Sequence, residues 1–328
     1  MAGPFYNLIN GTSFGTAGTG AFSPSAAVAG YLAWSTVPTG WIGLVKFTDG
    51  AAWEIQYSYW SGSTLSRAAT TQFVSSSTGT ALTLTSAAVA AMVADANDIS
   101  AGAISPKSIV RPQLGATTLS TSGIAAPTVT GTASAATLAS TNLMTEQLRT
   151  VSTSATTANA QAGFTSAVQM AFGFSTAGRG GYDFGCRFGT STIPTGPRLF
   201  VGVTNLTQVA KITEVSAGSQ SSAAFALDST DTIIQLMTNN STTTATKTNT
   251  GIALVANGWY EARIWQNPGS ATVNGLLIRR DTGAIWYGTA AGPSGGIMFP
   301  QCIGGLSATT CTAFTLNFGG FYVRPGAH

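Results

Sequence analysis

Residues 231–251 read DTIIQLMTNNSTTTATKTNTG, and this stretch decides the fold. It begins with an apolar run at 233–237, continues through Asn239 and Asn240, and ends in a row of threonines. The apolar run is hydrophobic on both alternating faces, as expected of a strand in the core of a sandwich. Asparagine tolerates the positive φ of a tight turn, and β-branched threonine favours an extended strand. The stretch therefore predicts a β-hairpin rather than a low-complexity linker.

The composition of the 328-residue chain also favours β-structure. Hydrophobic residues account for 44% of the chain and charged residues for only 8%. Disordered chains combine low hydrophobicity with high net charge, whereas the formal net charge here is +3. Ser, Thr, Gly and Ala replace the missing charge, and the strong helix formers Glu and Lys are scarce. We therefore expect an all-β protein with many turns.

The sequence argues against nucleic acid and membrane as partners. Its basic residues are scattered, apart from Arg279 and Arg280, so no basic patch is expected for nucleic acid. No apolar stretch reaches the length of about 18 residues that a membrane-spanning helix needs, so no membrane insertion is expected. The N-terminus, MAGPFYNLING, lacks the basic start and apolar core of a signal peptide, which indicates folding in a cytoplasm.

The three cysteines, Cys186, Cys302 and Cys311, do not have the spacing of a zinc site. Their odd number favours three buried, reduced thiols, since free cysteine is among the most buried residue types. A Cys302–Cys311 disulfide is the alternative.

The chain divides into three parts by sequence pattern. Residues 1–98 contain alternating stretches at 41–47 and 52–59, which an Asp-Gly turn signal joins, and they predict a small β module. Residues 99–141 contain three prolines and many small residues but no aromatic residue, so they predict a partly extended spacer. Residues 142–328 form the third part.

The third part contains nine strand-like stretches with Gly, Asn and Pro between them, which predicts a two-sheet β-sandwich of jelly-roll type. The nine stretches are 167–174, 182–188, 198–204, 222–228, 232–238, 259–266, 274–280, 284–290 and 315–323.

The hairpin sequence resembles a domain that recurs in virion structural proteins of tailed bacteriophages. Members of this family show an R-W/F-F-V-G-L strand, a block D-T-N-L-Q-I-M-H-N-D-G-S-G-T-A-T-K, and an R-x-x-T-G step. This chain has RLFVGVTN at 198–205 and RRDTG at 279–283. Its departures, Thr238 and the pair at 240–241, lie at the turn. The positions that match the central block are Asp231, Thr232, Gln235, Met237, Asn239, Thr244, Ala245, Thr246 and Lys247.

The N-terminal part carries a second resemblance, to a small β module at the front of many phage tail and fibre proteins. Its hallmarks are a D-G-x-x-W-E strand pair, then L-x-R and S-S-x-G. The usual G-T-Y after the Trp-Glu strand is replaced here by QYSYW. The matching positions are Asp49, Gly50, Trp53, Glu54, Leu65, Arg67, Ser76, Ser77 and Gly79.

Together the two resemblances imply a non-enzymatic structural component of a tailed-phage virion, made in the host cytoplasm. The expected protein is a tail fibre or tail-tip protein, attached to other virion proteins through residues 1–98, with a sandwich that binds a host-surface carbohydrate. Such proteins are usually homotrimers. The alternative is a head fibre, decoration or collar protein with a purely assembly role.

The residues do not favour catalysis, a cofactor or a metal. The sole histidine is His328, the last residue, which is poorly placed for a Ser-His-Asp triad or a zinc site. A glycosidase needs two carboxylates that flank the scissile bond. Asp228 and Asp231 are close in sequence but flank Ser-Thr, which is typical of a turn. A polysaccharide-cleaving activity is therefore only a distant third hypothesis.

The strand 259–266 carries the candidate site. Alternation places Tyr260, Ala262 and Ile264 on one face, which suits the core. The other face combines indoles with an acid and a guanidinium, groups that stack on and hydrogen-bond a sugar. A contact between subunits is the favoured competing interpretation, because Trp, Tyr and Arg are equally enriched there. The candidate residues are Trp259, Glu261, Arg263 and Trp265, extended by Trp286 and Tyr287 from the strand two further along.

Overall fold

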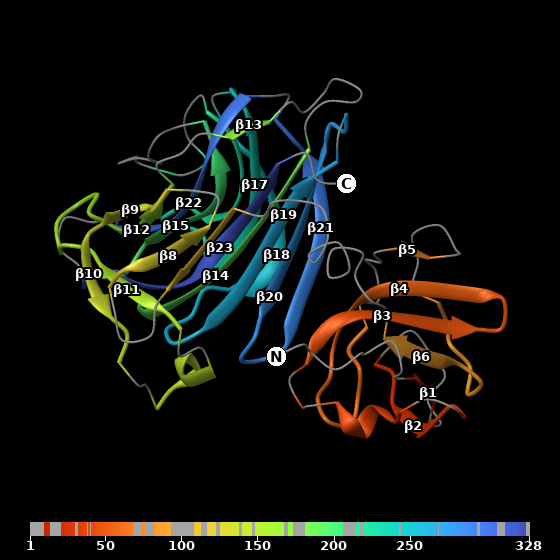
Figure 1. Cartoon of the computed structure of the whole chain (residues 1–328). Coiled ribbons are helices and arrows are strands. Elements are labelled where there is room, and N and C mark those ends of the chain that lie inside the picture. The colour runs from red at the N-terminus through yellow and green to blue at the C-terminus, as the bar shows by residue number, and fades with distance from the viewer. Residues whose placement is uncertain are drawn as a thin grey trace. The chain divides into compact units, whose positions relative to one another are not determined.

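The computed structural model of the chain is built almost entirely of β-strands (Figure 1), so the all-β prediction is confirmed. The chain forms two compact units, residues 1–104 with 283–287, and residues 105–282 with 288–328. The structure describes residues 10–13, 21–29, 32–37, 39, 41–67, 74–75, 82–92, 108–112, 117–122, 125–137, 140–145, 148–166, 170–172, 181–205, 214, 216, 220–242, 244–267, 269–293, 296–306 and 312–325. Within these residues, no helix has the length and apolarity that crossing a membrane requires.

The first unit is one antiparallel sheet with the strand order β2-β1-β6-β3-β4-β5. Its core contains the buried aromatic side chains Trp34, Phe47 and Trp60. The ring centres of Trp34 and Trp60 lie 5.7 Å apart, and both indoles belong to one hydrophobic cluster. The strands are β1 (Asn10–Ser13), β2 (Pro24–Ala27), β3 (Ile42–Asp49), β4 (Ala52–Tyr59), β5 (Val74–Ser75) and β6 (Val89–Met92), with a short 3-10 helix, η2 (Trp34–Thr36).

The matched motif of the first unit stabilises its fold. Gly50 has φ +61° in the predicted turn between β3 and β4, a conformation that glycine adopts without strain. The Asp49 carboxylate beside it accepts hydrogen bonds from the backbone N–H and the hydroxyl of Thr85, at 2.6 and 2.9 Å. Three other motif positions, Ser76, Ser77 and Gly79, lie outside the described residues.

Glu54 and Arg67 of the same motif form a buried ion pair. The Glu54 carboxylate lies 2.6 Å from an Arg67 nitrogen, and both side chains are shielded from solvent. Glu54 also accepts the backbone N–H of Leu82, and Arg67 donates to the Leu82 carbonyl oxygen, both at 2.8 Å. The pair therefore ties β4 to two following segments of the chain.

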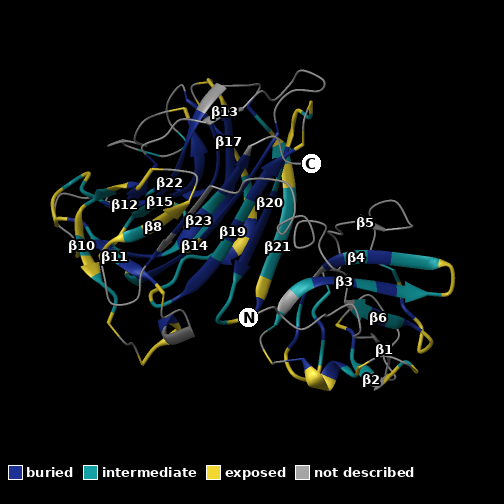
Figure 2. Ribbon diagram, viewed as in Figure 1, coloured by how far each residue is buried: buried dark blue, intermediate teal, exposed yellow. Residues whose placement is uncertain are grey.

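The second unit is a two-sheet β-sandwich, as predicted. One sheet has the order β10-β11-β23-β14-β19-β20-β21, with β7 paired to β23 and β8 to β7. The other has the order β18-β17-β16-β15-β22-β12-β9, with β13 paired to β22. Buried residues line the strands of both sheets (Figure 2). Between the sheets, the rings of Phe164 and Phe318 stack with their centres 4.4 Å apart.

We refer to the first of these as the front sheet and to the other as the back sheet. The front-sheet strands are β7 (Ser108–Pro112), β8 (Leu119–Ser122), β10 (Thr132–Ala135), β11 (Thr150–Thr153), β14 (Tyr182–Thr192), β19 (Trp259–Gln266), β20 (Thr272–Arg279), β21 (Ala284–Ala291) and β23 (Thr315–Pro325). The back-sheet strands are β9 (Thr128–Thr130), β12 (Gln161–Thr165), β13 (Met170–Phe172), β15 (Pro197–Thr204), β16 (Ser221–Leu227), β17 (Ile233–Asn240), β18 (Thr246–Ala253) and β22 (Gly296–Leu306). A 3-10 helix, η3 (Asn142–Thr145), precedes β11.

The stretch 231–251 forms the predicted hairpin from β17 and β18, in which Leu236 pairs with Thr248. The turn differs in one detail, because the positive φ of 60° falls on Ser241 and not on an asparagine. The Asn239 side chain instead accepts the N–H of Thr242 at 2.9 Å and donates to its carbonyl oxygen at 3.1 Å. Asn239 thus closes the turn through its amide group.

Asp231 and Lys247, the two ends of the block that resembles phage virion proteins, meet in an ion-pair cluster. Lys247 lies 2.8 Å from the Asp231 carboxylate and 2.7 Å from that of Asp228. Asp228 and Asp231 also share a turn, in which the Asp231 N–H donates to the Asp228 carbonyl oxygen at 2.9 Å. Burial favours a higher pKa for Asp228, but hydrogen bonds from Lys247 and Ser216 outweigh it and lower this pKa. Although burial opposes it, bonding to the two aspartates raises the pKa of Lys247.

We predict that this cluster makes the stability of the second unit depend on pH. The folded-state pKa of Asp228 lies below its unfolded value of 3.8. The ionised Asp228 carboxylate therefore stabilises the fold fully above about pH 4, and this stabilisation is lost at lower pH. Lys247→Met should lower the free energy of unfolding at pH 7 by about 1–3 kcal/mol, since a buried carboxylate loses a donor. Urea unfolding between pH 2 and pH 7 should show the difference from wild type shrinking below about pH 4. A difference that stays constant with pH would contradict this assignment.

The structure differs from the predicted spacer in the described part of residues 99–141. Residues 108–135 form β7, β8, β9 and β10, which pair within the sandwich, with β7 next to β23 and β10 next to β11. Most described side chains of β8, β9 and β10 are exposed or half-buried, so these strands need no large apolar residues. The absence of aromatic residues therefore marks strands at the margins of the sheets rather than a separate spacer.

Cys186 and Cys302 are buried free thiols, which agrees with the prediction of reduced cysteines and not with a Cys302–Cys311 disulfide. Cys311 lies outside the described residues. Burial and the neighbouring Cys302 thiol raise the pKa of Cys186 well above its ordinary value.

We predict that a thiol reagent at pH 8 reacts far more slowly with Cys186 and Cys302 in the folded protein than in the unfolded one, because only the exposed thiolate reacts. Denaturation without reductant should release three thiols per chain. A count of one would reveal an intramolecular disulfide.

Candidate functional site

The structure confirms the two faces predicted for the candidate strand, β19. Tyr260, Ala262 and Ile264 are fully buried in the core. The Tyr260 ring stacks on Phe188, with ring centres 5.2 Å apart, and burial raises the pKa of Tyr260 to about 12. The opposite residues of β19 face away from the back sheet. In the register with β14, Glu261 pairs with Arg187, so both lie on this outer face.

The two indoles predicted on the outer face are not displayed to solvent. Trp259 is 1% exposed and Trp265 is 7% exposed. A Cβ at Gly189 would lie 2.5 Å from the Trp259 ring and 3.0 Å from the Leu143 side chain, so the two side chains meet above this glycine. Trp259 is thus covered by η3, and the expectation of an open sugar-stacking indole is wrong at this position.

A buried arginine, Arg149, anchors the segment that covers Trp259. Its guanidinium donates to the Asn317 side-chain oxygen at 3.0 Å and to the Leu143 and Thr137 carbonyl oxygens at 2.9 and 2.8 Å. An arginine that satisfies backbone carbonyl groups in this way fixes the path of a loop. Sequence reasoning missed Arg149, because an isolated arginine carries no motif.

The remaining predicted residues separate into two groups. Trp286 and Tyr287 lie on β21, which is two strands from β19 as predicted, and both are half-buried. Neither lines the cavity described below, whereas Glu261 and Arg263 do. The structure therefore brings two of the six candidate residues into one cavity.

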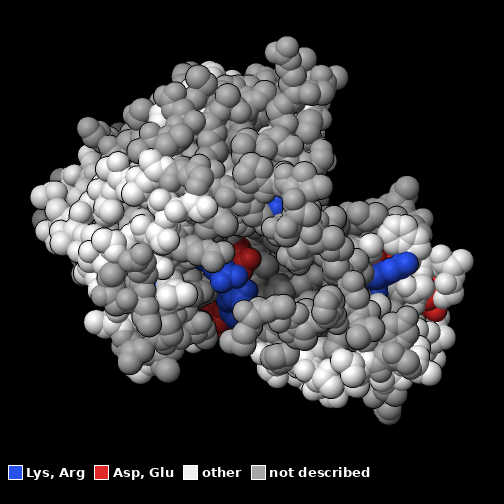
Figure 3. All heavy atoms as spheres, viewed as in Figure 1, with Lys and Arg blue, Asp and Glu red and all other residues white. Residues whose placement is uncertain are grey.

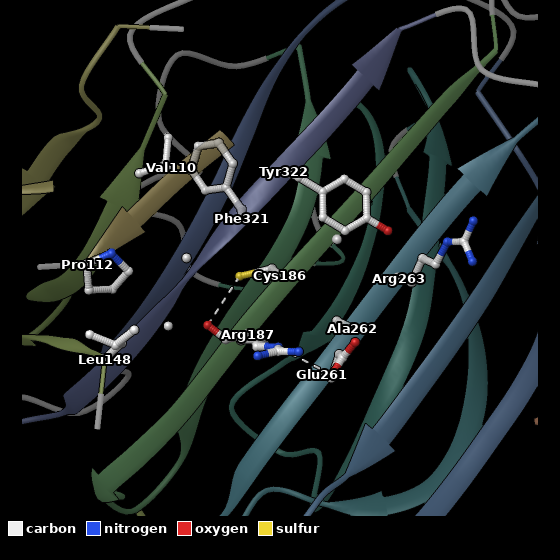
Figure 4. Close-up of a pocket in the computed structure, with 13 residues that line it drawn as sticks. Val110, Pro112, Leu148, Cys186, Arg187, Glu261, Ala262, Arg263, Phe321 and Tyr322 are labelled. Atoms are coloured by element: carbon white, nitrogen blue, oxygen red, sulfur yellow. Dashed lines mark hydrogen bonds and ion pairs between the residues drawn. The ribbon is translucent and has the colours of Figure 1, made fainter. Parts of the chain in front are cut away.

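That cavity, of about 400 Å³, lies on the outer face of the front sheet, where β7, β23, β14 and β19 are neighbours. Apolar side chains lie on one side of it and charged side chains on the other (Figure 4). Its volume is within the range of small-molecule sites. The lining residues are Val110, Pro112, Leu148, Gly185, Cys186, Arg187, Glu261, Ala262, Arg263, Gly319, Gly320, Phe321 and Tyr322.

Ion pairs order the charged side of the cavity. The Glu261 carboxylate lies 3.4 Å from Arg187 and 3.0 Å from Arg280. Arg263 pairs with Asp183 at 3.0 Å and also lies over the Trp265 ring, 4.9 Å from its centre. Figure 3 shows basic and acidic side chains side by side on a face of the second unit.

Glycines form part of the cavity floor, and they decide its shape. A Cβ at Gly185 would lie 2.2 Å from the Tyr322 ring, so this ring rests directly on the glycine. The Tyr322 hydroxyl donates to Asp183 at 3.2 Å, which holds the ring in place. The cavity thus combines hydrogen-bonding groups with an aromatic ring, and nothing in the sequence signalled the glycines.

Fold and site together define a class: an all-β protein whose second unit is a β-sandwich with a charged cavity on the outer face of one sheet. No family model and no curated protein sequence matches the chain. Similar solved structures include lectin II from Ulex europaeus, with 9% identity, a TM-score of 0.43, and coverage of 61% of this chain and 93% of the lectin. They also include peanut lectin with a 9-residue peptide, which has 13% identity and a TM-score of 0.43. That match covers 62% of this chain and 92% of the peanut lectin chain. The Emp47p carbohydrate recognition domain has 8% identity and a TM-score of 0.45. That match covers 72% of this chain and 100% of the Emp47p domain.

Proposed function

We propose that the chain is a non-enzymatic structural component of a tailed-phage virion, a tail fibre or tail-tip protein whose second unit binds host-surface carbohydrate. The virion role is supported by two sequence resemblances that lie in different units and indicate the same class of particle. Residues 1–98 attach the protein to other virion proteins in this proposal, and three copies assemble into a trimer.

The places of the matched residues support these resemblances. Asp231 and Lys247, at the two ends of the phage-like block, form an ion pair across the hairpin. Glu54 and Arg67 of the N-terminal motif form the buried pair of the first unit. The partners lie 16 and 13 positions apart in the sequence, and each pair ties together two segments of the matched motif.

The cavity is the observation that carries the carbohydrate-binding proposal. A sugar presents hydroxyl groups around its rim and apolar C–H groups on its faces. The guanidinium of Arg187 and the carboxylate of Glu261 can hydrogen-bond the hydroxyls. The Tyr322 ring and the exposed side chain of Leu148 offer apolar surface to a face of the ring.

Binding without hydrolysis is supported by the state of the carboxylates. Glu261 is the sole acidic residue among the lining residues, and it is bonded to two arginines. Asp183, the nearby second carboxylate, is buried and paired with Arg263. Glycoside hydrolysis needs two carboxyl groups that flank the scissile bond, one to act as an acid and one as a base or nucleophile, and carboxylates held in ion pairs suit neither role.

An assembly role on the head or collar is the second candidate. Leu148, at the cavity, is one of two large hydrophobic side chains that are exposed in the described part of the chain. An apolar side chain beside a charged patch also suits a contact with another virion protein.

Immunogold labelling of intact particles with an antibody to residues 142–328 separates the two roles. Label at the distal tail would support host binding, and label on the capsid or collar would support the assembly role. An absence of label from the particle would overturn the virion proposal. Light scattering at micromolar concentration tests the trimer, which a monomer would contradict.

A further inference from the structure

One edge of β23 leaves a gap beside the cavity. β14 pairs with the other edge of β23 along its length, so the edge opposite β14 is shared by two strands. β11 pairs there with residues 315–318, and β7 pairs with residues 321–323. Gly319 and Gly320 lie between these two pairings and have no side chain to fill the space. The front sheet therefore has a notch at these glycines, between the end of β7 and the start of β11.

The side chains around this notch are apolar. Val110 and Pro112 come from β7 and are buried, and Leu148 shortly precedes β11. Leu148 is 48% exposed, so a large apolar side chain is open at the cavity. A hydroxyl group placed against these side chains would lose its hydrogen bonds to water and gain none from them. We use the name notch for Val110, Pro112, Leu148, Gly319 and Gly320 together.

The Glu261 carboxylate, on the other side of the cavity, has one oxygen atom open to a ligand. Arg187 and Arg280 both contact the same atom of this carboxylate, Oε2. Within the described part of the chain, Oε1 has no hydrogen-bond or ion-pair partner, and the side chain is 34% exposed. A carboxylate oxygen accepts hydrogen bonds from hydroxyl groups. Oε1 is therefore a position for one hydroxyl group of a ligand.

The notch and the Glu261 carboxylate lie on opposite sides of one cavity of about 400 Å³, as the positions of Pro112, Leu148 and Glu261 in Figure 4 show. A ligand that suits both sides combines hydroxyl groups with a small apolar group. Sugars that carry a methyl group have this composition, either in place of a hydroxymethyl group or at the end of an acetyl group. A hexose without a methyl group would place a hydroxyl group against the notch.

We propose that the cavity selects a sugar that carries a methyl group, a 6-deoxyhexose or an N-acetylated aminosugar, with the methyl group in the notch and a hydroxyl group on Oε1 of Glu261. This proposal rests on the proposed carbohydrate-binding function and narrows the class of its ligand. The methyl group is the chemistry that the two kinds of sugar share.

The test measures binding of the full chain to immobilised sugars in matched pairs, within a wider panel of neutral glycans. The pairs are L-fucose with L-galactose, L-rhamnose with L-mannose, and N-acetylglucosamine with N-formylglucosamine. The methyl-bearing member of at least one pair should bind at least about 4-fold more tightly, the gain from burying one methyl-sized group. A preference in a deoxy pair or in the acetyl pair shows which kind of sugar supplies the methyl group.

Two variants separate the notch from the hydroxyl position. Leu148→Asn should abolish the preference within the pair, because a polar amide replaces the apolar surface. Glu261→Ala should weaken both members by a similar factor of about 10-fold and keep the preference, because it removes the acceptor of a hydroxyl group. Leu32→Asn is the matched control, since Leu32 is a 52% exposed leucine of the first unit, and it should keep both affinity and preference.

Equal binding within every pair, or a preference that Leu148→Asn leaves unchanged, would overturn the inference and leave carbohydrate binding intact. If no glycan of the panel bound, with or without a methyl group, both proposals would fail.

Discussion

We expect the substitution Glu54→Gln to lower the free energy of unfolding of the first unit by about 3–5 kcal/mol, the cost of leaving one partner of a buried ion pair uncompensated. Glu54 is fully buried, and Arg67 has a side-chain exposure of 1%. The Glu54 carboxylate accepts from Arg67, from Gln56 at 2.8 Å and from the backbone of Leu82. Glutamine has nearly the same shape but leaves the Arg67 charge buried without its counterion.

Hydrogen–deuterium exchange of the full chain measures this effect within one unit. Amides of β3 and β4 should exchange at least about 100-fold faster in Glu54→Gln, while those of β14 and β19 stay unchanged. The double variant Glu54→Leu with Arg67→Met is the control. Because the double variant removes both charges, it should lower the free energy of unfolding by less than either single change. Unchanged protection of β3 and β4 in Glu54→Gln would show that the buried pair does not stabilise the unit.

The second large effect is expected for Trp259→Ala, which should destabilise the second unit by about 3–5 kcal/mol, as is usual for a buried tryptophan. The indole lies between the glycines at 189 and 319 of the front sheet and the side chain of Leu143. Its loss would leave a cavity under η3 and loosen the segment that Arg149 holds.

Urea unfolding followed by circular dichroism measures the change for Trp259→Ala. The variant Leu148→Ala is the control and should change stability by less than about 0.5 kcal/mol, because Leu148 is exposed. If Trp259 were instead a sugar platform, Trp259→Ala would keep its stability and lose glycan binding. That outcome would contradict the burial of the indole.

Much of the fold could be predicted from the sequence, because local pattern and final burial agree in most strands. Each of the nine predicted stretches of the third part contains a strand, and residues 231–251 form the hairpin. The strand β22 was missed because Pro300 and two glycines, Gly304 and Gly305, resemble a loop. In the structure, Pro300 lies where the partner of β22 changes from β13 to β12. Proline has no backbone N–H to donate, and at this position its absence interrupts neither pairing.

The candidate site was only half predictable. Alternation along β19 gave the correct face for Glu261 and Arg263, since strand geometry alone decides which side chains share a face. Alternation cannot show what covers that face. The segment that buries Trp259 is held by Arg149, and the cavity floor depends on glycines from β14 and β23. Leu143 is far in sequence from Trp259, as Tyr322 is from Gly185, and no local pattern reports such neighbours.

The central claim is that the cavity beside Arg187 is where the second unit binds carbohydrate. The most direct measurement is binding of the full chain to a panel of neutral and carboxylated glycans, compared between wild type, Arg187→Ala and Arg198→Gln. The account predicts that wild type and Arg198→Gln bind the same glycans and that Arg187→Ala binds them at least about 10-fold more weakly. Glycan binding that survives Arg187→Ala unchanged, or its absence in the wild-type protein, would contradict the account.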